Sequence, residues 1–230
     1  MGQDESLRLA ALYLQSRAET YSYGYQQEWC GVPVIRLPDD IVALQEIVWQ
    51  TRPRFIIETG VARGGSLVLS ASLMAMAQVP PRVLGIDIQI LEHARRAISD
   101  SPFAPYIDIW EGDSAGDAAK DRVMRFIRET EGTGLGLLVL DSDHSHAHVL
   151  EELRKHAPLL PIGSLVLVAD TLIEESPPGH YPDRPWDQGS SPMTAVRAFL
   201  TESSDYGLSK MWCRRGLLTE FRDGVIERFR

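Results

Sequence analysis

Apolar positions along this chain follow two spacings in turn, and this alternation predicts strands and helices in regular succession. The near-continuous apolar run at 135–140 is typical of a strand buried on both faces, whereas 117–129 shows helical spacing. Asp39 or Asp40 is expected to cap the second helix, and Ser191 the last. The expected helices cover 5–18, 40–50, 66–77, 92–98, 117–129, 146–157 and 191–200. The expected strands cover 55–59, 82–88, 107–110, 135–140, 164–169, 208–212, 216–221 and 225–229.

Strands that alternate with helices this regularly predict an α/β fold, a doubly wound and mostly parallel sheet with helices on both faces. The 230 residues, of which 44% are hydrophobic, are enough for one core, so a single domain is expected over 1–230. Residues 1–52 are expected to form an N-terminal helical extension. The proline-rich stretch 174–189 is long for a connection, and we expect it to be a lid loop over the crevice.

Composition excludes several partners. The net charge of -9 argues against nucleic acid, which needs clustered Lys and Arg. The longest apolar run, 67–77, falls short of the ~20 residues that a membrane span requires, so no membrane partner is expected. Cys30 and Cys213 suit a reducing compartment and show no metal-binding spacing. Since the first residues lack the basic and apolar regions of a signal peptide, we expect a cytoplasmic protein.

A glycine-rich turn in 55–66 joins an apolar strand to an apolar helix. Gly60, Gly64 and Gly65 allow the backbone to approach a bound molecule, and the helix offers free N–H groups to an anionic part of it. The pattern E-x-G-x-x-x-G-G-S differs from the G-x-G-x-x-G of dinucleotide-binding proteins, because it lacks a second tight glycine for a pyrophosphate. The turn therefore favours S-adenosylmethionine (SAM) over NAD.

Acidic residues end the next two expected strands. Asp87 ends the second, where a carboxylate accepts hydrogen bonds from the ribose hydroxyls of an adenosine-containing cofactor. Asp113 and Ser114 follow the third strand, at the place expected for the adenine. A solvated turn carboxylate is the usual alternative for each one alone, but acidic residues at the ends of consecutive strands favour a binding site.

The densest polar cluster follows the fourth strand, and Asp170 follows the fifth. Asp141 and Asp170 can converge on one hard cation such as Mg²⁺, which prefers oxygen ligands. His144 is the candidate general base for an acceptor hydroxyl, and Asp141 the acidic residue beside it. His146 and His148 are expected to cap the helix or to face solvent. A two-histidine, one-carboxylate iron site is the competing interpretation, but it leaves the SAM features unexplained.

Two aromatic segments are candidates for binding the acceptor molecule. The lid loop carries His180, Tyr181 and Trp186, of which Trp186 could stack on a sugar ring; the alternative is a mobile surface loop. The second segment would line the acceptor pocket or form an oligomer contact, and consists of Tyr21, Tyr23, Tyr25 and Trp29.

Several motifs in order carry a family resemblance: Trp29-Cys30-Gly31-Val32-Pro33, Gln45-Glu46-Ile47, Ile57-Glu58-Thr59-Gly60, Gly64-Gly65-Ser66, Leu140-Asp141-Ser142-Asp143-His144, Val149-Leu150, Asp170-Thr171, Ser191-Pro192-Met193-Thr194-Ala195-Val196 and Phe199-Leu200. Over nearly its whole length, the chain resembles the cephalosporin hydroxylase/rhamnosyl O-methyltransferase family. The resemblance implies a Rossmann-like methyltransferase fold and a divalent-metal site near Asp141 and Asp170. It also implies a SAM site around Glu58, Gly60, Ser66, Asp87 and Asp113.

The resemblance further implies O-methylation of a hydroxyl on a sugar or other small natural product, by a homo-oligomer. One departure concerns the metal: the family usually carries Glu-Asp after the fifth strand, and here the pair is Ala169-Asp170. Asp143, Glu174 or water would supply the missing oxygen ligand, or binding is weak, or the enzyme works without metal. Two other classes stay open, a metal-dependent hydroxylase or oxygenase and a SAM-binding partner protein without catalysis.

Overall fold

The computed structural model describes residues 4–130, 132–213 and 215–230, so the first three residues of the expected N-terminal extension lie outside it. The α-helices are α1 (Glu5–Glu19), α2 (Pro38–Thr51), α3 (Gly65–Met76), α4 (Glu92–Ser99), α5 (Asp117–Glu129), α6 (His146–His156) and α7 (Pro192–Glu202). The strands are β1 (Gln27–Trp29), β2 (Val32–Val34), β3 (Phe55–Thr59), β4 (Val83–Asp87), β5 (Ile107–Glu111), β6 (Gly136–Leu140), β7 (Leu165–Val168), β8 (Tyr206–Leu208) and β9 (Val225–Arg228). Short 3₁₀ turns are η1 (Tyr23–Tyr25), η2 (Ala104–Tyr106), η3 (Ala157–Leu159) and η4 (Thr171–Glu175).

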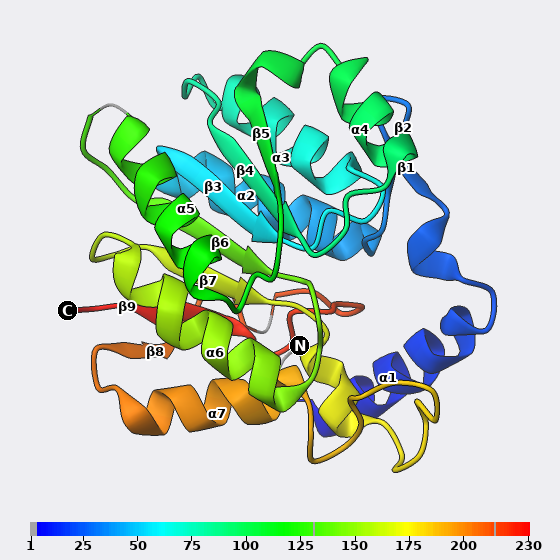
Figure 1. Ribbon diagram of the computed structural model, residues 1–230. Coiled ribbons are helices and arrows are strands. Elements are labelled where there is room, and N and C mark those ends of the chain that lie inside the picture. The colour runs from blue at the N-terminus through cyan, green and yellow to red at the C-terminus, as the bar shows by residue number, and fades with distance from the viewer. Residues whose placement is uncertain (1–3, 131, 214) are drawn as a thin grey trace.

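One sheet runs through the centre of the described chain in the order β5-β4-β3-β6-β7-β9-β8 (Figure 1). The strands from β5 to β7 are parallel, and β9 is antiparallel to both of its neighbours. Successive strands after β3 first extend the sheet on one side, through β4 and β5, and the chain then crosses to the other side of β3. The strand order therefore reverses between β3 and β6, which is where open α/β sheets bind ligands.

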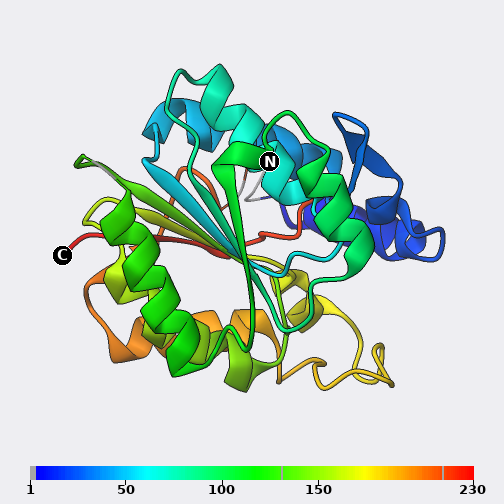
Figure 2. The same ribbon diagram turned by 45° about the horizontal axis from the view of Figure 1, so that its top comes forward.

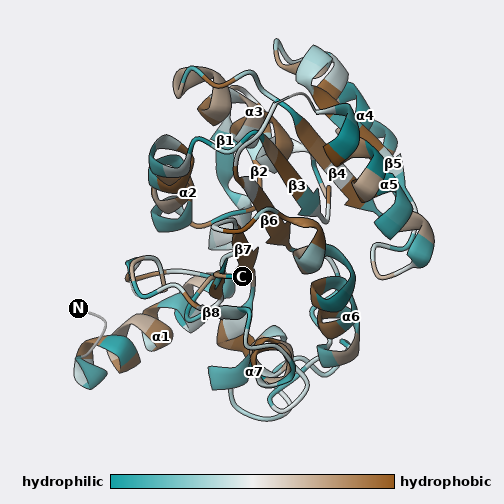
Figure 3. Ribbon diagram, turned by 90° about the vertical axis from the view of Figure 1, so that its left-hand side faces the viewer, coloured by the Kyte–Doolittle hydropathy of each residue, from teal (hydrophilic) through white to brown (hydrophobic). Residues whose placement is uncertain are grey.

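Helices cover both faces of the sheet (Figure 2). Ile56 on β3 belongs to the core formed with α2, α3 and α4, whereas its neighbour Ile57 belongs to the core formed with α5, α6 and α7. This alternation follows from the period of two along a strand. The central strands are mostly hydrophobic because both faces are buried, and polar residues stand at the carboxyl ends of β3 and β4 (Figure 3). The expected doubly wound α/β fold is confirmed.

The tail after α7 differs from the expectation. The predicted strands 208–212 and 216–221 are wrong: only Leu208 lies in a strand, at the end of β8, while β9 matches the last predicted strand. Side chains of α2 satisfy the backbone here instead of a neighbouring strand. Asp39 accepts the N–H groups of Leu217 and Leu218 at 3.0 and 3.1 Å. The segment is thereby fixed as an irregular loop against α2.

The start of the chain also departs from a purely helical extension. A hairpin of β1 and β2 lies between α1 and α2, and its strands are too short to give a periodic signal. The predicted cap at Asp39 or Asp40 is wrong, since α2 begins with Leu37 as its N-cap and Pro38 as its first residue. Ser191 does cap α7, with its side chain accepting the N–H of Thr194. None of the described helices has the length and apolar character to cross a membrane.

Candidate active site

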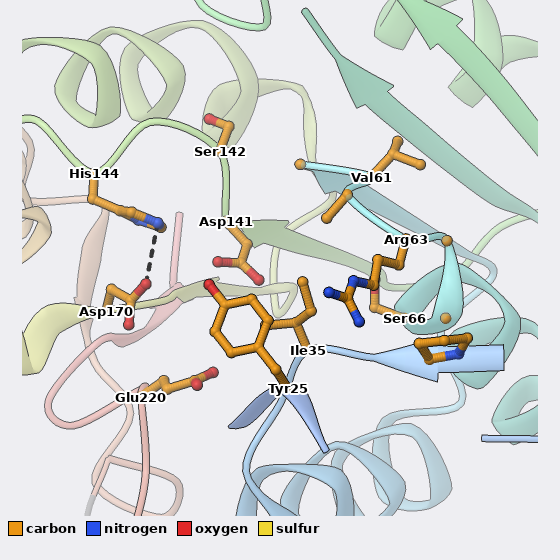
Figure 4. A pocket seen from close by; sticks show the side chains of 15 residues that line it. Tyr25, Ile35, Val61, Arg63, Ser66, Asp141, Ser142, His144, Asp170 and Glu220 are labelled. Atoms are coloured by element: carbon orange, nitrogen blue, oxygen red, sulfur yellow. Dashed lines mark ion pairs between the residues drawn. The ribbon is translucent and has the colours of Figure 1, made fainter. Parts of the chain in front are cut away.

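A cavity of about 210 Å³ opens where the carboxyl ends of β3 and β6 meet, at the reversal of the strand order (Figure 4). The turn after β3 forms one wall, and polar side chains that follow β6 and β7 form the opposite wall. The full lining is Tyr25, Pro33, Ile35, 60–66, Asp141, Ser142, His144, Asp170 and Glu220. Residues far apart in the sequence therefore share one hollow.

The glycine-rich turn is packed tightly against its neighbours. Gly60 has φ +91°, and a Cβ there would lie 1.9 Å from the carbonyl oxygen of Asp141. A Cβ on Gly65 would lie 2.2 Å from the carbonyl oxygen of Pro33. Since neither position leaves room for a side chain, the glycines fix how closely β6 and β2 approach the turn. Gly60, Gly64 and Ser66, three of the predicted cofactor residues, line the cavity.

Asp87 lies beneath this turn at the end of β4. Its Oδ2 accepts the N–H groups of Val61 at 2.7 Å and Ala62 at 3.2 Å, and its Oδ1 accepts the N–H of Gln89. The carboxylate therefore holds the turn in shape and is half-buried beside it. Its nearness to the turn agrees with a place beside the cofactor, while the predicted ribose contact stays a prediction.

Asp113 and Ser114 lie after β5, outside the cavity lining. The Asp113 side chain is exposed and accepts the N–H of Ala115 at 3.0 Å. Ser114 is buried, and its hydroxyl lies 3.0 Å from Nε2 of His148. His156 reaches the carbonyl of Ser114 from α6 at 2.7 Å. The end of β5 is thus tied to α6, and the predicted adenine contacts are not tested by these bonds.

An ion cluster that the sequence did not predict lies under the cavity. Arg36, only 1% exposed, contacts Glu58 at 3.0 Å and Asp141 at 3.4 Å through the same nitrogen, Nη2. Burial raises the pKa of Glu58, and the charge of Arg36 works against that rise. Glu58 does not line the cavity, so a direct contact with the cofactor stays a prediction. The available signal was a lone arginine inside the apolar run 32–37.

Asp141, His144 and Asp170 form the polar wall. Each offers one ligand atom, and these three atoms lie within 4.8 Å of one another. Nε2 of His144 is 3.1 Å from Oδ2 of Asp170 (Figure 4). Burial raises the pKa of Asp141 to about 7; the positive charge of Arg36 opposes the rise, and the negative charge of Asp170 adds to it. Two carboxylates and one imidazole at this spacing fit a divalent cation by the chemistry of their donor atoms.

The other two histidines of the cluster have partners of their own. Nδ1 of His146 lies 2.8 Å from the hydroxyl of Thr194 on α7. His148 contacts Ser114, Ser142 and the buried Glu152, with its Nε2 3.5 Å from Glu152 Oε1. Burial alone would lower the pKa of His148, but the hydrogen bond and charge of Glu152 outweigh it and raise the pKa. The prediction that both histidines cap α6 or face solvent is wrong: both are half-buried and hold α6 against its neighbours.

The lid loop places one of its predicted residues at this wall. The ring of Trp186 packs edge-on against the ring of His144, with centroids 4.8 Å apart. His180 and Tyr181 lie further out, where Nε2 of His180 is 3.4 Å from Glu19 of α1. Burial raises the pKa of Tyr181 to about 12. Figure 1 shows α1 beside this loop, away from the sheet.

The second aromatic segment divides between two roles. Tyr25 lines the cavity across from Asp170 and His144 (Figure 4). Trp29 instead donates its indole N–H to Ser72 on α3 at 2.8 Å. Tyr21 is 70% exposed. Only one of the four therefore contributes to the pocket, and the expectation that the segment lines it holds for Tyr25 alone.

The two carboxylates expected as possible substitutes for a metal ligand at position 169 are engaged elsewhere. Oδ1 of Asp143 accepts the N–H of Ser145 at 2.8 Å, and Asp143 does not line the cavity. Glu174 accepts the hydroxyl of Ser191 at 2.8 Å and the N–H of Gly189 at 2.9 Å. Glu174 thus closes the base of the lid loop, and neither carboxylate faces the three ligand atoms.

A family model described as rhamnosyl O-methyltransferase/CmcI matches residues 21–229. This chain belongs to that family. A rhamnosyl O-methyltransferase of Mycobacterium leprae (strain TN) is 30% identical over 174 residues, which cover 76% of this chain and 70% of the relative. That of Mycobacterium tuberculosis (strain ATCC 25618 / H37Rv) is 31% identical over 183 residues, covering 77% and 68%.

The fold is shared with solved structures as well. A CmcI structure with magnesium and SAM superimposes with a TM-score of 0.60 at 19% identity, covering 90% of this chain and 78% of that one. At this identity the likeness concerns the fold. The predicted family and the predicted class of SAM-dependent O-methyltransferase are confirmed together with the fold.

Proposed function

We propose that this protein transfers the methyl group of SAM to a hydroxyl of a sugar or another small natural product. One observation carries the proposal: the glycine-rich turn and the His144–Asp170 pair open into the same cavity. A methyl donor bound along the turn would have its acceptor on the opposite wall. The curated relatives are named as methyltransferases of rhamnosyl groups, which supports a sugar hydroxyl as the acceptor.

For the cofactor, we assign the turn residues Gly60, Gly64 and Ser66 to direct contact. Asp87 would meet the ribose hydroxyls next to the turn that it holds. Asp113 and Ser114 would meet the adenine, and Glu58 would act from below through Arg36 and the shape of the turn. The assignment of Gly60, Gly64 and Ser66 is supported by their position, because all three line the cavity.

In the proposed reaction, the acceptor oxygen attacks the methyl carbon as the carbon–sulfur bond breaks, and S-adenosylhomocysteine leaves. Alignment of the two reactants supplies much of the acceleration. His144 takes the hydroxyl proton, and Asp170 at 3.1 Å orients its ring and favours the imidazolium that forms. Asp141 and Asp170 would hold Mg²⁺, with His144 beside it. When bound, the cation would polarise the acceptor hydroxyl.

The lid loop is assigned to the acceptor. Trp186 packs on His144 and is the part of the loop nearest the proposed chemistry. His180 and Tyr181 would contact the outer portion of a larger acceptor, because both lie nearer α1. The loop and the extension belong to a single domain over 1–230 in this proposal. A homo-oligomer and a cytoplasmic location stay predictions.

The competing classes differ in what they require. Against an iron site with two histidines of the 144–148 cluster, His146 contacts Thr194 and His148 contacts Ser114, and among the described residues only His144 is grouped with Asp141 and Asp170. A hydroxylase would therefore need another ligand set. A SAM-binding partner protein without catalysis keeps the cofactor site but lacks turnover, so activity measurements separate it.

The test has two stages. Calorimetric titration with SAM and S-adenosylhomocysteine should give micromolar binding, and radiolabelled SAM should then methylate members of a panel of rhamnosides and other glycosides. Binding without transfer to any acceptor would favour the inactive partner protein. If neither ligand bound, the methyltransferase proposal would be abandoned.

A further inference from the structure

A third carboxylate, Glu220, lines the same cavity as Asp141 and Asp170 (Figure 4). It comes from the irregular segment between β8 and β9, the part of the tail that the sequence pattern predicted as a strand. Its side chain points into the hollow from the side of the tail. The polar wall thus includes a residue about fifty positions from Asp170, the nearer of these two in the sequence.

The backbone around Glu220 is fixed at the metal site. Its N–H donates to Oδ2 of Asp40 at 2.8 Å, and its carbonyl accepts both the N–H and the hydroxyl of Thr171 at 3.2 Å. Thr171 directly follows Asp170, so the tail is bonded to the chain next to a proposed ligand. The hydroxyl of Thr171 also donates to the carbonyl of Arg222 at 2.6 Å. These bonds hold the backbone of Glu220 and do not involve its carboxylate.

The Glu220 carboxylate has no competing partner among the described residues. No hydrogen bond or ion pair within 4.0 Å reaches it there, and Arg36 directs its contacting nitrogen to Glu58 and Asp141 instead. Asp143 and Glu174, the other carboxylates considered, are both bonded elsewhere. Among these acidic side chains, Glu220 alone is both directed into the cavity and available.

The charges around the cavity are unbalanced. Asp141, Asp170 and Glu220 line it. Two arginines face these carboxylates: Arg63, which also lines the cavity, and the buried Arg36, which is shared between Glu58 and Asp141. Glu220 lies outside the group of ligand atoms within 4.8 Å that Asp141, His144 and Asp170 form, but it lines the same cavity, and like charges in a partly desolvated cavity repel one another. A divalent cation bound between the three carboxylates would remove the repulsion, and Mg²⁺ and Mn²⁺ both favour such oxygen ligands.

We infer that Glu220 is a ligand of the divalent metal in this protein and supplies the oxygen that Ala169 cannot. The inference rests on the proposed function, because it concerns the same metal site. Ala169 is 1% exposed within the hydrophobic core, and its methyl group offers no ligand atom. The replacement ligand comes from the tail. With three carboxylates on the cation, His144 is free to accept the hydroxyl proton.

The test measures metal binding directly, with Mn²⁺ as the probe. Free Mn²⁺ is followed by electron paramagnetic resonance while the full-length protein is titrated, with and without S-adenosylhomocysteine. Glu220→Gln should weaken Mn²⁺ binding by about tenfold or more. Glu174→Gln serves as the matched control, because it removes a carboxylate that is bonded elsewhere, and it should bind Mn²⁺ as the wild type does.

Glu220→Asp separates ligation from charge. This variant keeps the negative charge but shortens its reach by one methylene, so a true ligand predicts weaker Mn²⁺ binding than in the wild type. Unchanged affinity in Glu220→Asp, or equal affinity in wild type and Glu220→Gln, would overturn the inference, and so would a wild-type protein that binds no Mn²⁺. Circular dichroism checks that the variants are folded.

Calorimetry with S-adenosylhomocysteine in EDTA keeps the two proposals apart. If S-adenosylhomocysteine binds and the Glu220 variants bind Mn²⁺ as tightly as the wild type, only the inference about Glu220 fails. If the cofactor product does not bind, the proposed function fails, whatever Mn²⁺ does. Cofactor binding together with the expected order of Mn²⁺ affinity, Glu above Asp above Gln, supports both.

Discussion

The two walls of the cavity are built in different ways. The wall that we assign to the cofactor, the cofactor wall, is one continuous stretch, 60–66, positioned by backbone contacts, by two glycines and by the carboxylate of Asp87. The opposite wall, which we assign to the acceptor and call the acceptor wall, brings together side chains from the ends of β6 and β7, from the lid loop and from the tail. A wall made of local backbone tolerates little change, whereas a wall made of distant side chains can vary in specificity without loss of the fold.

Ion pairs secure the acceptor wall from outside. Arg8 of α1 pairs with Glu175 at the end of η4, and Glu19 of α1 contacts His180 in the lid loop. These pairs are partly exposed and contribute little stability each. The lid loop is therefore held less firmly than the glycine-rich turn, which agrees with its proposed role as the segment that admits the acceptor.

The largest effect is expected on the acceptor wall. His144→Ala should lower the rate of methyl transfer by about a thousandfold, because the hydroxyl loses its proton acceptor. Calorimetry should give unchanged affinity for S-adenosylhomocysteine. His146→Ala is the control, since its ring contacts Thr194 instead of the cavity. Comparable rates in wild type and His144→Ala would remove this residue from the mechanism.

Alanine substitutions at two glycines, one in the glycine-rich turn and one in the lid loop, allow a direct comparison of the two walls. Gly60 and Gly179 both have positive φ, +91° and +78°, but only Gly60 has backbone atoms where a Cβ would lie. Gly60→Ala should lower the free energy of unfolding by about 3 kcal/mol or more. Gly179→Ala, in the lid loop, should cost about 1 kcal/mol from backbone conformation alone. Urea unfolding measures both, and equal losses would contradict the contrast between the walls.

Asp87 holds the cofactor wall through two hydrogen bonds from its backbone N–H groups. Asp87→Asn should weaken SAM binding by about tenfold, as charged hydrogen bonds to the turn and to the ribose are lost. The maximal rate should change less. Asp117→Asn removes an exposed carboxylate that pairs with Lys155 and should bind SAM normally. Wild-type affinity in Asp87→Asn would exclude the ribose assignment.

Acid should stabilise the metal-free protein. Burial raises the pKa of Asp141 to about 7 and that of Asp40 to about 6. The folded state then holds protons that the unfolded chain has lost, so this stability is present at low pH and disappears as pH rises through 7. The gain from pH 8 to 5 should be on the order of 1 kcal/mol, roughly 2–4 °C in Tm. Calorimetric scans in EDTA measure it, and Asp141→Asn should flatten the profile.

The smallest effect concerns the lid. Trp186→Ala should raise KM for the acceptor by several-fold, on the order of 1 kcal/mol, because an aromatic contact beside His144 is lost. SAM affinity should stay the same, since Trp186 does not line the cofactor wall. Trp49→Ala, which removes an exposed ring on α2, is the control. A change in SAM affinity without a change in acceptor KM would reverse the assignment of the two walls.

Local signals explain which parts of the structure could be predicted. The strands β3 to β7 and the helices between them follow from the apolar pattern, because the central strands are apolar runs buried on both faces and most of the helices bury one periodic face. The segment 209–221 has a strand-like composition but pairs with α2 through Asp39 and Asp40, which no periodicity reveals. The hairpin of β1 and β2 was missed because three residues are too few to show a period.

The sequence by itself determined the strands β3 to β7, the glycine-rich turn and the polar residues at the ends of these strands, since each depends on neighbours along the chain. Only the tertiary structure decided which charges meet. Arg36 lies 105 positions from Asp141, and Glu220 lines the cavity, where its backbone is bonded to Asp40 and Thr171. Such contacts depend on how the strand order and the tail bring distant residues together. Local sequence patterns do not indicate which distant residues will meet.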